Sequence, residues 1–305
     1  MNDTPFHAGE QAVQALAGES QIAQRVGQML QPEIGVQAIP FLQQQPMVVI
    51  ASPDTNGHIW ASLLVGDVGF VEVFSTQSLV LHEDQLQSAD TDILYENLKG
   101  NPRVGLLFHE MEHRRRYRVN GQAVRKDGQI QINVEEAYVN CPKYIQKRTT
   151  TRREEIQAPV RVSRGQVLGA LELDWIRQAD TFFLATQSLA GKADASHRGG
   201  KAGFVEILDN GQLRIPDYPG NSLFNSLGNI HENPKAGLLF VDFEQGNVLQ
   251  LTGKATLSFG QNAADDLAKT GDTGRFWLFE TTEWIRTDHH HQKQWDWVDY
   301  SPFNP

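Results

Sequence analysis

From residue 46 onward, hydrophobic residues occur in short runs that are rich in β-branched and aromatic side chains. In the first half of the chain these runs are Met47–Ala51, Trp60–Val65, Gly69–Phe74, Ser78–His82, Val104–Phe108 and Tyr117–Val124. Turn residues separate them, as in Asp54-Thr55-Asn56-Gly57 and Lys126-Asp127-Gly128. Short apolar runs between turn signals are typical of antiparallel strands in a barrel or sandwich. The pattern therefore predicts a mainly β chain.

Helical spacing of apolar residues occurs at two places. Within residues 8–31, Val13, Leu16, Ile22, Val26 and Leu30 fall on helical turns that are interrupted near Gly18. This spacing predicts one or two amphipathic helices that pack against the rest of the molecule. A further helix is predicted over Arg164–Ala179.

The second half of the chain repeats the first. The segment Gly66–Val73 (GDVGFVEV) matches Gly200–Ile207 (GKAGFVEI), and Asn97–Phe108 (NLKGNPRVGLLF) matches Asn229–Phe240 (NIHENPKAGLLF). We expect two copies of one β-rich unit, each with a helix that leads into an Asn-Pro turn and then a buried strand. A duplicated chain can form a site across the interface of its two copies, as a twofold homodimer does between two chains.

The two copies differ in their polar residues. Residues 109–121 of copy one (HEMEHRRRYRVNG) contain a cluster of arginines, whereas the matching residues 241–253 of copy two (VDFEQGNVLQLTG) contain none. Strand alternation places Arg116 and Arg118 on one face and Tyr117 on the other. A solvated strand face would explain these arginines equally well.

Copy two has its own polar stretch, Asp194–Asn229, in which two glycine-rich segments flank Phe204–Ile207, a predicted buried strand. Backbone N–H groups at glycines, hydroxyl and amide donors, and a guanidinium suit a phosphate anion. The candidate donors are Ser196, His197, Arg198, Gly199 and Gly200 in the first segment, and Asn221, Ser222 and Asn225 in the second, which also contains Asp217. Such clusters are also common as plain turns between strands, so both interpretations stay open.

Composition narrows the classes of partner. The 305 residues carry 27 Lys plus Arg against 37 Asp plus Glu, a net charge of −10, which argues against general binding to nucleic acid or to anionic membranes. An anionic ligand must then be held by local donors. The single cysteine, Cys141, excludes an internal disulfide and fits a cytoplasmic protein. No apolar run reaches the length of about 18 residues that a membrane span needs, and no secretion signal is expected.

Five motifs together resemble a known family. They are PFHAGEQAVQ at the start, RRRYRVNG and NCPKYIQKR in the middle, SHRGGKAGFV later and SPFNP at the end. The combination resembles the bacterial proteins of the pyridoxamine 5′-phosphate oxidase-like superfamily, the FMN-binding split β-barrels, and covers nearly the whole chain as a tandem pair. The resemblance implies an α+β, mainly β fold in which two split barrels pack as a pseudo-dimer with FMN between them.

The resemblance also implies a set of cofactor-binding residues. Ser196, His197 and Arg198 would lie on the first phosphate-binding strand, and Asn221, Ser222 and Asn225 after the next strand, with Gly199, Gly200 and Asp217 beside them. The opposite barrel would supply Arg116 and Arg118 near the flavin ring or a substrate anion. The usual Arg and Lys pair of the family is replaced here by Ser-His-Arg and Gly-Asn-Ser, so flavin binding is better supported than vitamin B6 oxidation.

Three further segments are candidates. Asn140–Gln146 resembles a loop that opens a helix, and could contact flavin through Lys143, Tyr144 or Gln146, or be only a helix start with a buried Cys141. His289–His291 are consecutive and cannot share one face, so we predict a solvated tail and no metal site. The aromatic residues Trp295, Trp297 and Tyr300 could stack on the flavin or pack against the core. His109 and His113 lack a recognisable acid–base partner.

These observations predict four segments: an N-terminal helical segment (1–40), a first split barrel with NCPKYIQKR (41–160), a second split barrel (161–286) and an aromatic tail (287–305). The predicted function is an FMN-binding oxidoreductase with a small-molecule redox substrate. A nicotinamide donor and a homodimer stay open. No catalytic residue is predicted, because the flavin would carry the redox chemistry. The alternative is a non-catalytic flavin carrier or sensor, or an inactive interaction scaffold.

Overall fold

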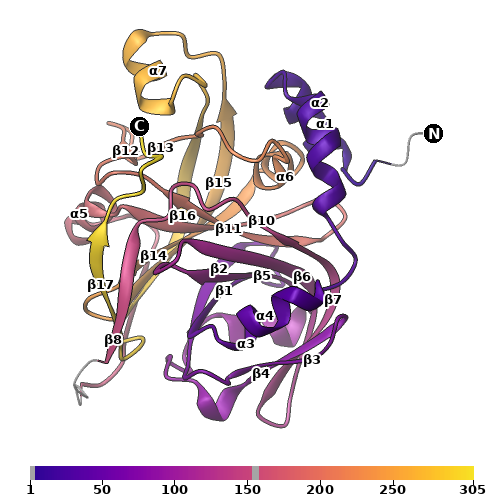
Figure 1. Ribbon diagram of the computed structural model, residues 1–305. Coiled ribbons are helices and arrows are strands. Elements are labelled where there is room, and N and C mark those ends of the chain that lie inside the picture. Colours follow the sequence, from indigo (N-terminus) through magenta and orange to yellow (C-terminus); the bar gives the residue numbers. More distant parts are fainter. Residues whose placement is uncertain (1–3, 153–157) are drawn as a thin grey trace.

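The computed structural model describes residues 4–152 and 158–305 and shows one antiparallel sheet for each sequence repeat (Figure 1). The strands of copy one are β1 (Met47–Pro53), β2 (Ile59–Val65), β3 (Val71–Ser75), β4 (Ser78–His82), β5 (Arg103–Glu110), β6 (Arg115–Lys126) and β7 (Gln129–Val139). They pair in the order β2-β1-β5-β6-β7-β4-β3. The strand predictions for the first half of the chain are thereby confirmed.

Copy two repeats this topology. Its strands are β10 (Thr181–Gln187), β11 (Ala193–Gly199), β12 (Glu206–Ile207), β13 (Leu213–Pro216), β14 (Lys235–Asp242), β15 (Asn247–Ser258) and β16 (Phe276–Asp288). They pair in the order β11-β10-β14-β15-β16-β13-β12, and β9 (Arg161–Gly165) adds to the far side of β16. The chain is therefore mainly β with helices, built as two tandem split barrels, as predicted.

Among the described residues, three large apolar cores and one small cluster around Phe6 and Tyr138 hold the molecule together. One fills copy one around Phe108, and a second fills copy two around Phe240 and Trp277. The third lies between the copies and contains residues of both, including Leu63 of β2 and Phe183 of β10. Strand alternation explains this arrangement, because successive side chains of β1 and β10 point alternately into their own barrel and into the shared core.

The helices are short. They are α1 (Ala8–Leu16), α2 (Ser20–Val26), α3 (Ile39–Gln43), α4 (Leu94–Gly100), α5 (Ala170–Gln178), α6 (Asn225–Glu232) and α7 (Ala264–Thr270). The two predicted N-terminal helices are confirmed, with the interruption at Gly18 between them. Within the described part of the chain, no helix combines the length and the hydrophobicity that crossing a membrane requires.

Helix α1 packs against α6 of copy two, although it precedes copy one in the sequence (Figure 1). The contact is close because glycines meet there: a Cβ on Gly9 would lie 2.3 Å from the carbonyl oxygen of Gly228. Glu10 of α1 accepts a hydrogen bond of 2.6 Å from the Asn225 amide at the start of α6. The N-terminal segment thus positions the helix that follows one of the predicted phosphate-binding segments.

A two-stranded ribbon joins the ends of the two repeats. β8 (Lys147–Arg152), which follows copy one, pairs antiparallel with β17 (Lys293–Asp299), which follows copy two. Antiparallel pairing of equivalent segments is what a twofold axis produces. The ribbon therefore extends the pseudo-symmetry of the barrels.

Four local predictions are wrong. Arg164–Ala179 is not one helix, because β9 ends at Gly165 and α5 begins only at Ala170. The predicted strand Phe204–Ile207 is a turn at Phe204 followed by the two-residue edge strand β12. Asn140–Gln146 opens no helix, since a turn there leads into β8. His290 and His291 are buried rather than solvated, because a neighbouring segment of copy one covers them.

Candidate functional site

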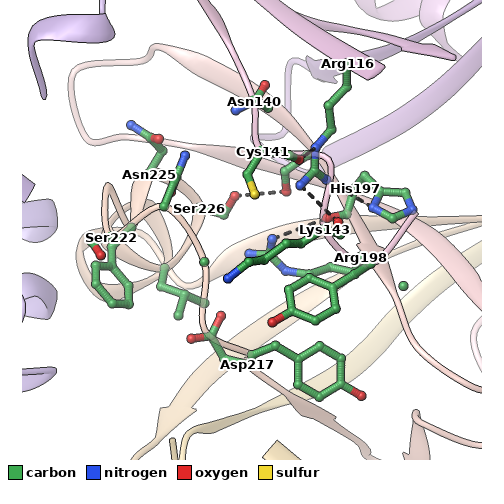
Figure 2. Close-up of a pocket in the computed structure, with 18 of the residues that line it drawn as sticks. Arg116, Asn140, Cys141, Lys143, His197, Arg198, Asp217, Ser222, Asn225 and Ser226 are labelled. Atoms are coloured by element: carbon green, nitrogen blue, oxygen red, sulfur yellow. Dashed lines mark hydrogen bonds between the residues drawn. The ribbon is translucent and has the colours of Figure 1, made fainter. Parts of the chain in front are cut away.

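A pocket lies where the two copies meet, and it collects the predicted site residues from distant parts of the chain (Figure 2). All of the predicted cofactor-binding residues except Gly200 line it: Arg116, Arg118, Lys143, Tyr144, Ser196, His197, Arg198, Gly199, Asp217, Asn221, Ser222 and Asn225. Gly200 lies outside the lining, packed against the Phe204 ring. Figure 2 shows Arg116 and Cys141 on one side, and Ser222 and Asn225 on the opposite side.

Sequence reasoning did not assign several other lining residues to this site. They are Asn140, Cys141, Phe204, Pro216, Tyr218, Gly220, Phe224, Ser226, Leu227 and Arg275. Most flank a predicted residue in the chain, so neighbourhood alone could have indicated them. Arg275 could not have been found in this way, because it enters from the start of β16.

Arg116 of β6 is the cation that copy one contributes most directly. Its Nε donates to the Cys141 carbonyl at 2.7 Å, and its Nη1 lies 3.1 Å from His197 Nδ1. Among the described residues, no carboxylate lies within 4.0 Å of its guanidinium. Burial, with a further contribution from Arg118, lowers the pKa of Arg116 to about 9. An anion in the pocket would relieve this unbalanced charge.

Arg198 of β11 is the cation that copy two contributes most directly to the pocket. Its only direct hydrogen bond within the described ranges is a long one, 3.4 Å, from Nη1 to the His197 carbonyl. Its Nε is buried without a hydrogen-bond partner there. Burial also lowers the pKa of Arg198. A buried guanidinium with unused donors is what a phosphate group needs.

Arg118 and Asp194 form a buried ion pair across the copies. The guanidinium of Arg118 on β6 lies 3.0 Å from the Asp194 carboxylate on β11 and donates to the Tyr138 hydroxyl at 2.5 Å. Asp194 also accepts from Ser226, whose hydroxyl is 2.9 Å from that of Ser196. This pair fixes the relative position of the two strands that carry Arg116 and Arg198.

Asp217 already has a cationic partner. Its carboxylate accepts from Arg275 Nε at 2.9 Å, and Arg275 in turn donates to Glu19 of the N-terminal segment at 2.6 Å. The second carboxylate oxygen of Glu19 accepts from the Ser222 hydroxyl. Burial raises the pKa of Asp217, while Arg275 lowers it. This network supports the pocket wall. Among the described residues of the pocket, the cations that have no carboxylate partner are then Arg116, Arg198 and Lys143.

Two histidines stack where the strands of the two copies meet. The rings of His109 (β5) and His197 (β11) are 4.7 Å apart and nearly parallel. Burial, followed by the charge of Arg116, lowers the pKa of His109 to about 3, and burial beside His109 lowers the pKa of His197. Both rings are therefore neutral at pH 7. Because a guanidinium only donates, His197 Nδ1 accepts and Nε2 carries the proton.

Backbone strain gathers around the pocket. Tyr144, Ser222 and Phe224 have positive φ values of 67°, 62° and 59°. Residues other than glycine rarely adopt this conformation, and such residues cluster at functional sites. Here the strained residues lie on the two segments that face each other across the pocket.

Tyr144 bridges the mouth of the pocket. Its hydroxyl donates to the Pro219 carbonyl at 2.8 Å, and its ring packs 4.9 Å from that of Tyr218. The C-terminal residues hold this loop in place: the Ser301 hydroxyl accepts from the Tyr144 N–H, and the Phe303 ring lies under the Lys143 ammonium. The C-terminal residues Ser301 and Phe303 are thus part of the site's frame.

The pocket is narrow but open. Its cavity has a volume of about 110 Å³ and opens to solvent. Small-molecule sites usually measure about 300–1,000 Å³. The enclosed part therefore suits a phosphate-sized group, and a larger ligand would also fill the open part.

The fold and this interfacial pocket define a tandem split-barrel protein with a cation-lined groove between its two copies. A sequence model of the pyridoxamine 5′-phosphate oxidase family matches residues 37–154 and 172–283, one match for each copy. The chain belongs to this family. A search of curated proteins found no match.

Several solved structures are similar to parts of the chain. HupZ of Group A Streptococcus is 15% identical over 35% of this chain and 93% of its own, with a TM-score of 0.28. A pyridoxamine 5′-phosphate oxidase-related, FMN-binding protein of Nostoc punctiforme is 12% identical over 45% and 100%, with a TM-score of 0.30. HutZ of Vibrio cholerae, titled a heme storage protein, is 12% identical over 40% and 96%, also with a TM-score of 0.30.

Proposed function

We propose that the protein binds FMN in the pocket between its two copies and acts as an FMN-dependent oxidoreductase on a small-molecule substrate. The observation that carries this proposal is the pair Arg116 and Arg198, one from each copy, half-buried in a shared pocket without carboxylate partners among the described residues. Membership of the pyridoxamine 5′-phosphate oxidase family supports a phosphorylated flavin as the ligand.

The residues present fit the phosphate of FMN. Arg198 would hold it with its unused Nε, and the Asn221 amide lies on the facing segment. Lys143, on the loop from copy one, adds a mobile positive charge at the mouth. Charge-assisted hydrogen bonds of this kind contribute roughly 1.5–3 kcal/mol each. Three such bonds would be enough for specific retention of a phosphorylated ligand.

The protein's own contribution to the chemistry is electrostatic and steric. Bound flavin would supply hydride or electron transfer. Arg116 would stabilise negative charge in the pocket, and the neutral His109–His197 stack keeps a second charge away from Arg116. The Tyr144–Pro219 hydrogen bond narrows the access of water from the mouth. No side chain is required as a general acid or base.

Comparison of FMN with riboflavin tests the role of the phosphate. Both ligands carry the same ring, so the purified protein, stripped of any bound flavin, should bind FMN at least about tenfold more tightly than riboflavin. Quenching of flavin fluorescence measures both affinities. Equal affinities would contradict the proposed phosphate site, and failure to bind either ligand would contradict the cofactor assignment.

Anaerobic mixing of the FMN-loaded protein with NADH or NADPH tests the oxidoreductase activity. Bleaching of the flavin absorbance is expected if a nicotinamide is the electron donor. A flavin that dithionite reduces but neither nicotinamide reduces would favour a carrier or sensor instead.

A further inference from the structure

The duplication creates a second groove, related to the first by the pseudo-twofold axis. Strand register identifies its residues. Phe108 and Phe240, which match in the repeat, pair with Val48 and Phe182, and these pair in turn with Leu64 and Arg198. Leu64 therefore occupies the position of Arg198 in the second groove. By the same register, Leu63 corresponds to His197.

The second groove has lost the cations of the first. Leu63 and Leu64 are fully buried in apolar cores. Arg116 pairs with His109, and at the matching position of copy two Val248 pairs with Val241. Val248 therefore replaces Arg116, and it is also fully buried. No guanidinium remains at any of these positions.

Arg118 also has a changed counterpart. Gln250 takes its place on β15, paired with Leu239 as Arg118 is paired with Leu107. Its amide nitrogen donates to the Ala61 carbonyl at 2.9 Å and lies 3.2 Å from the Ser62 hydroxyl. A neutral hydrogen bond therefore joins the copies here, where an ion pair joins them in the first groove.

The walls of the second groove are joined by the backbone. The segment after β16 folds onto the segment after β4: the Ala89 N–H donates to the His290 carbonyl at 2.7 Å, and Ser88 and His291 form a β-bridge. The His290 ring lies 2.8 Å from the Leu63 carbonyl. Ile285 pairs with Gln250, and His290 lies five residues after Ile285. In the first groove Tyr138 pairs with Arg118, and Lys143 lies five residues after Tyr138. His290 is therefore the counterpart of Lys143.

The first groove lacks this closure. Within the described residues, no backbone hydrogen bond joins its two walls, residues 140–144 and 217–224, and the Tyr144 hydroxyl makes the link to Pro219. The difference follows from the side chains. Lys143, Arg116 and Arg198 are all positively charged, so they repel one another when no anion lies between them, and this repulsion opposes closure of the first groove.

A hollow of about 280 Å³ remains at the surface of the second groove. Its size would admit a ligand, but no Arg or Lys lines it among the described residues, and the exposed carboxylate of Asp90 does. Phosphate is therefore disfavoured there.

We infer that only the groove containing Arg198 takes an anionic ligand, while the second groove has lost the cations and has its walls joined by backbone contacts of His290 and His291, so that one chain binds one FMN. The identity of the ligand rests on the function proposed above. The inference about the grooves rests on charge and closure.

Titration at protein concentrations well above the dissociation constant, at pH 8, measures the number of sites. One FMN per chain is expected, and two would overturn the inference. Arg198→Ala should weaken the single site about 10- to 100-fold, whereas Asp90→Ala, in the hollow of the second groove, should change neither stoichiometry nor affinity. An FMN site whose affinity changes in Asp90→Ala but not in Arg198→Ala would also overturn the inference.

A crystal soaked with inorganic phosphate separates this inference from the flavin proposal. Phosphate bound beside Arg198 and absent beside Asp90 supports the inference even if FMN does not bind. Phosphate bound beside Asp90 contradicts it. If neither FMN nor phosphate binds beside Arg198, both proposals fail.

Discussion

Arg116 and Arg198 differ from the other arginines in the interior of the protein. Arg118, Arg148 and Arg275 are buried, and each lies within 3.0 Å of a carboxylate: Asp194, Asp180 and Asp217 respectively. Removing a charge from water is costly, so interior charges are normally paired in this way. The two exceptions share one pocket, which is why they identify it as a site for an anion.

Replacing Arg198 by alanine should weaken FMN binding by about 10- to 100-fold, which corresponds to roughly 1.5–3 kcal/mol. The change removes a donor to the phosphate without breaking an ion pair. Arg103→Ala is the matched control, because Arg103 pairs with Glu135 and lies outside the pocket. Isothermal titration calorimetry measures both variants. An unchanged dissociation constant in Arg198→Ala would remove this residue from the phosphate site.

Glu10 is a titratable residue in the frame of the pocket. It accepts hydrogen bonds from Asn225 and from the His7 N–H. Burial raises the pKa of Glu10 from 4.5 to about 7, against the opposing effect of His7. The native state therefore holds a proton that the unfolded chain has released between these two pH values.

Stability should consequently fall as pH rises from about 4.5 to 7, since the native state binds the extra proton. The contribution of Glu10 is roughly 3 kcal/mol over this range. Glu10→Gln, which cannot ionise, should lose less stability than the wild type between pH 5 and pH 8. Urea unfolding of both proteins at the two pH values measures the difference. Parallel losses would show that Glu10 does not retain its proton.

At the scale of elements, the crossing of α1 and α6 determines how the N-terminal segment reaches the site. A Cβ on Gly228 would lie 2.6 Å from Glu10 Cα, so this backbone contact permits only glycine. Sequence periodicity predicted the two N-terminal helices correctly, but not their partner. Local spacing indicates a buried face, and nothing in residues 8–31 indicates which surface covers it.

Gly228→Ala should push α1 away from α6 and destabilise the protein by about 1–3 kcal/mol. It should also weaken FMN binding, because Asn225 and Ser222 are held by Glu10 and Glu19 of the N-terminal segment. Gly220→Ala is the control for stability, since no atom lies closer than 3.9 Å to its added Cβ. Thermal unfolding compares the two variants. Equal melting temperatures would exclude a tight helix crossing.

The errors in predicted elements have a common cause. Asn140–Gln146 has the composition of a helix start, with Pro142 near the first turn, yet its backbone is held by Arg116, Ser301 and Pro219 from three other segments. His290 and His291 are polar, yet a strand-like contact with Ser88 and Ala89 covers them. In both cases tertiary contacts outweigh a local preference.

For the molecule as a whole, the shared core makes the two copies one cooperative unit. Its members come from β1 and β2 of copy one, from β10 and β14 of copy two, and from Trp295 of the ribbon. Neither copy alone can exclude water from this apolar surface. The buried Arg118–Asp194 pair adds a polar contact that only the correct docking satisfies.

Thermal or urea unfolding should therefore show a single transition for both copies. Circular dichroism follows the strands, and tryptophan fluorescence follows the six tryptophans, which include Trp60 in copy one and Trp277 in copy two, so coincident curves are expected. Expression of residues 1–160 alone should give an aggregating chain, because it exposes the shared core. Two separate transitions would show that the copies fold independently.

The sequence alone determined the duplication, the strand pattern and most of the donors of the pocket. Repeats and strand alternation are local properties, and a glycine-rich polar segment is recognisable from its composition. Ser196–Arg198 and Arg116 could therefore be predicted as site residues from the sequence. The tertiary structure decided which cations lack a partner, because pairing depends on residues far apart in the chain, such as Asp194 and Arg118. It also decided that backbone contacts join the walls of the second groove, since His290 lies some two hundred residues from Leu63, whose carbonyl its ring contacts.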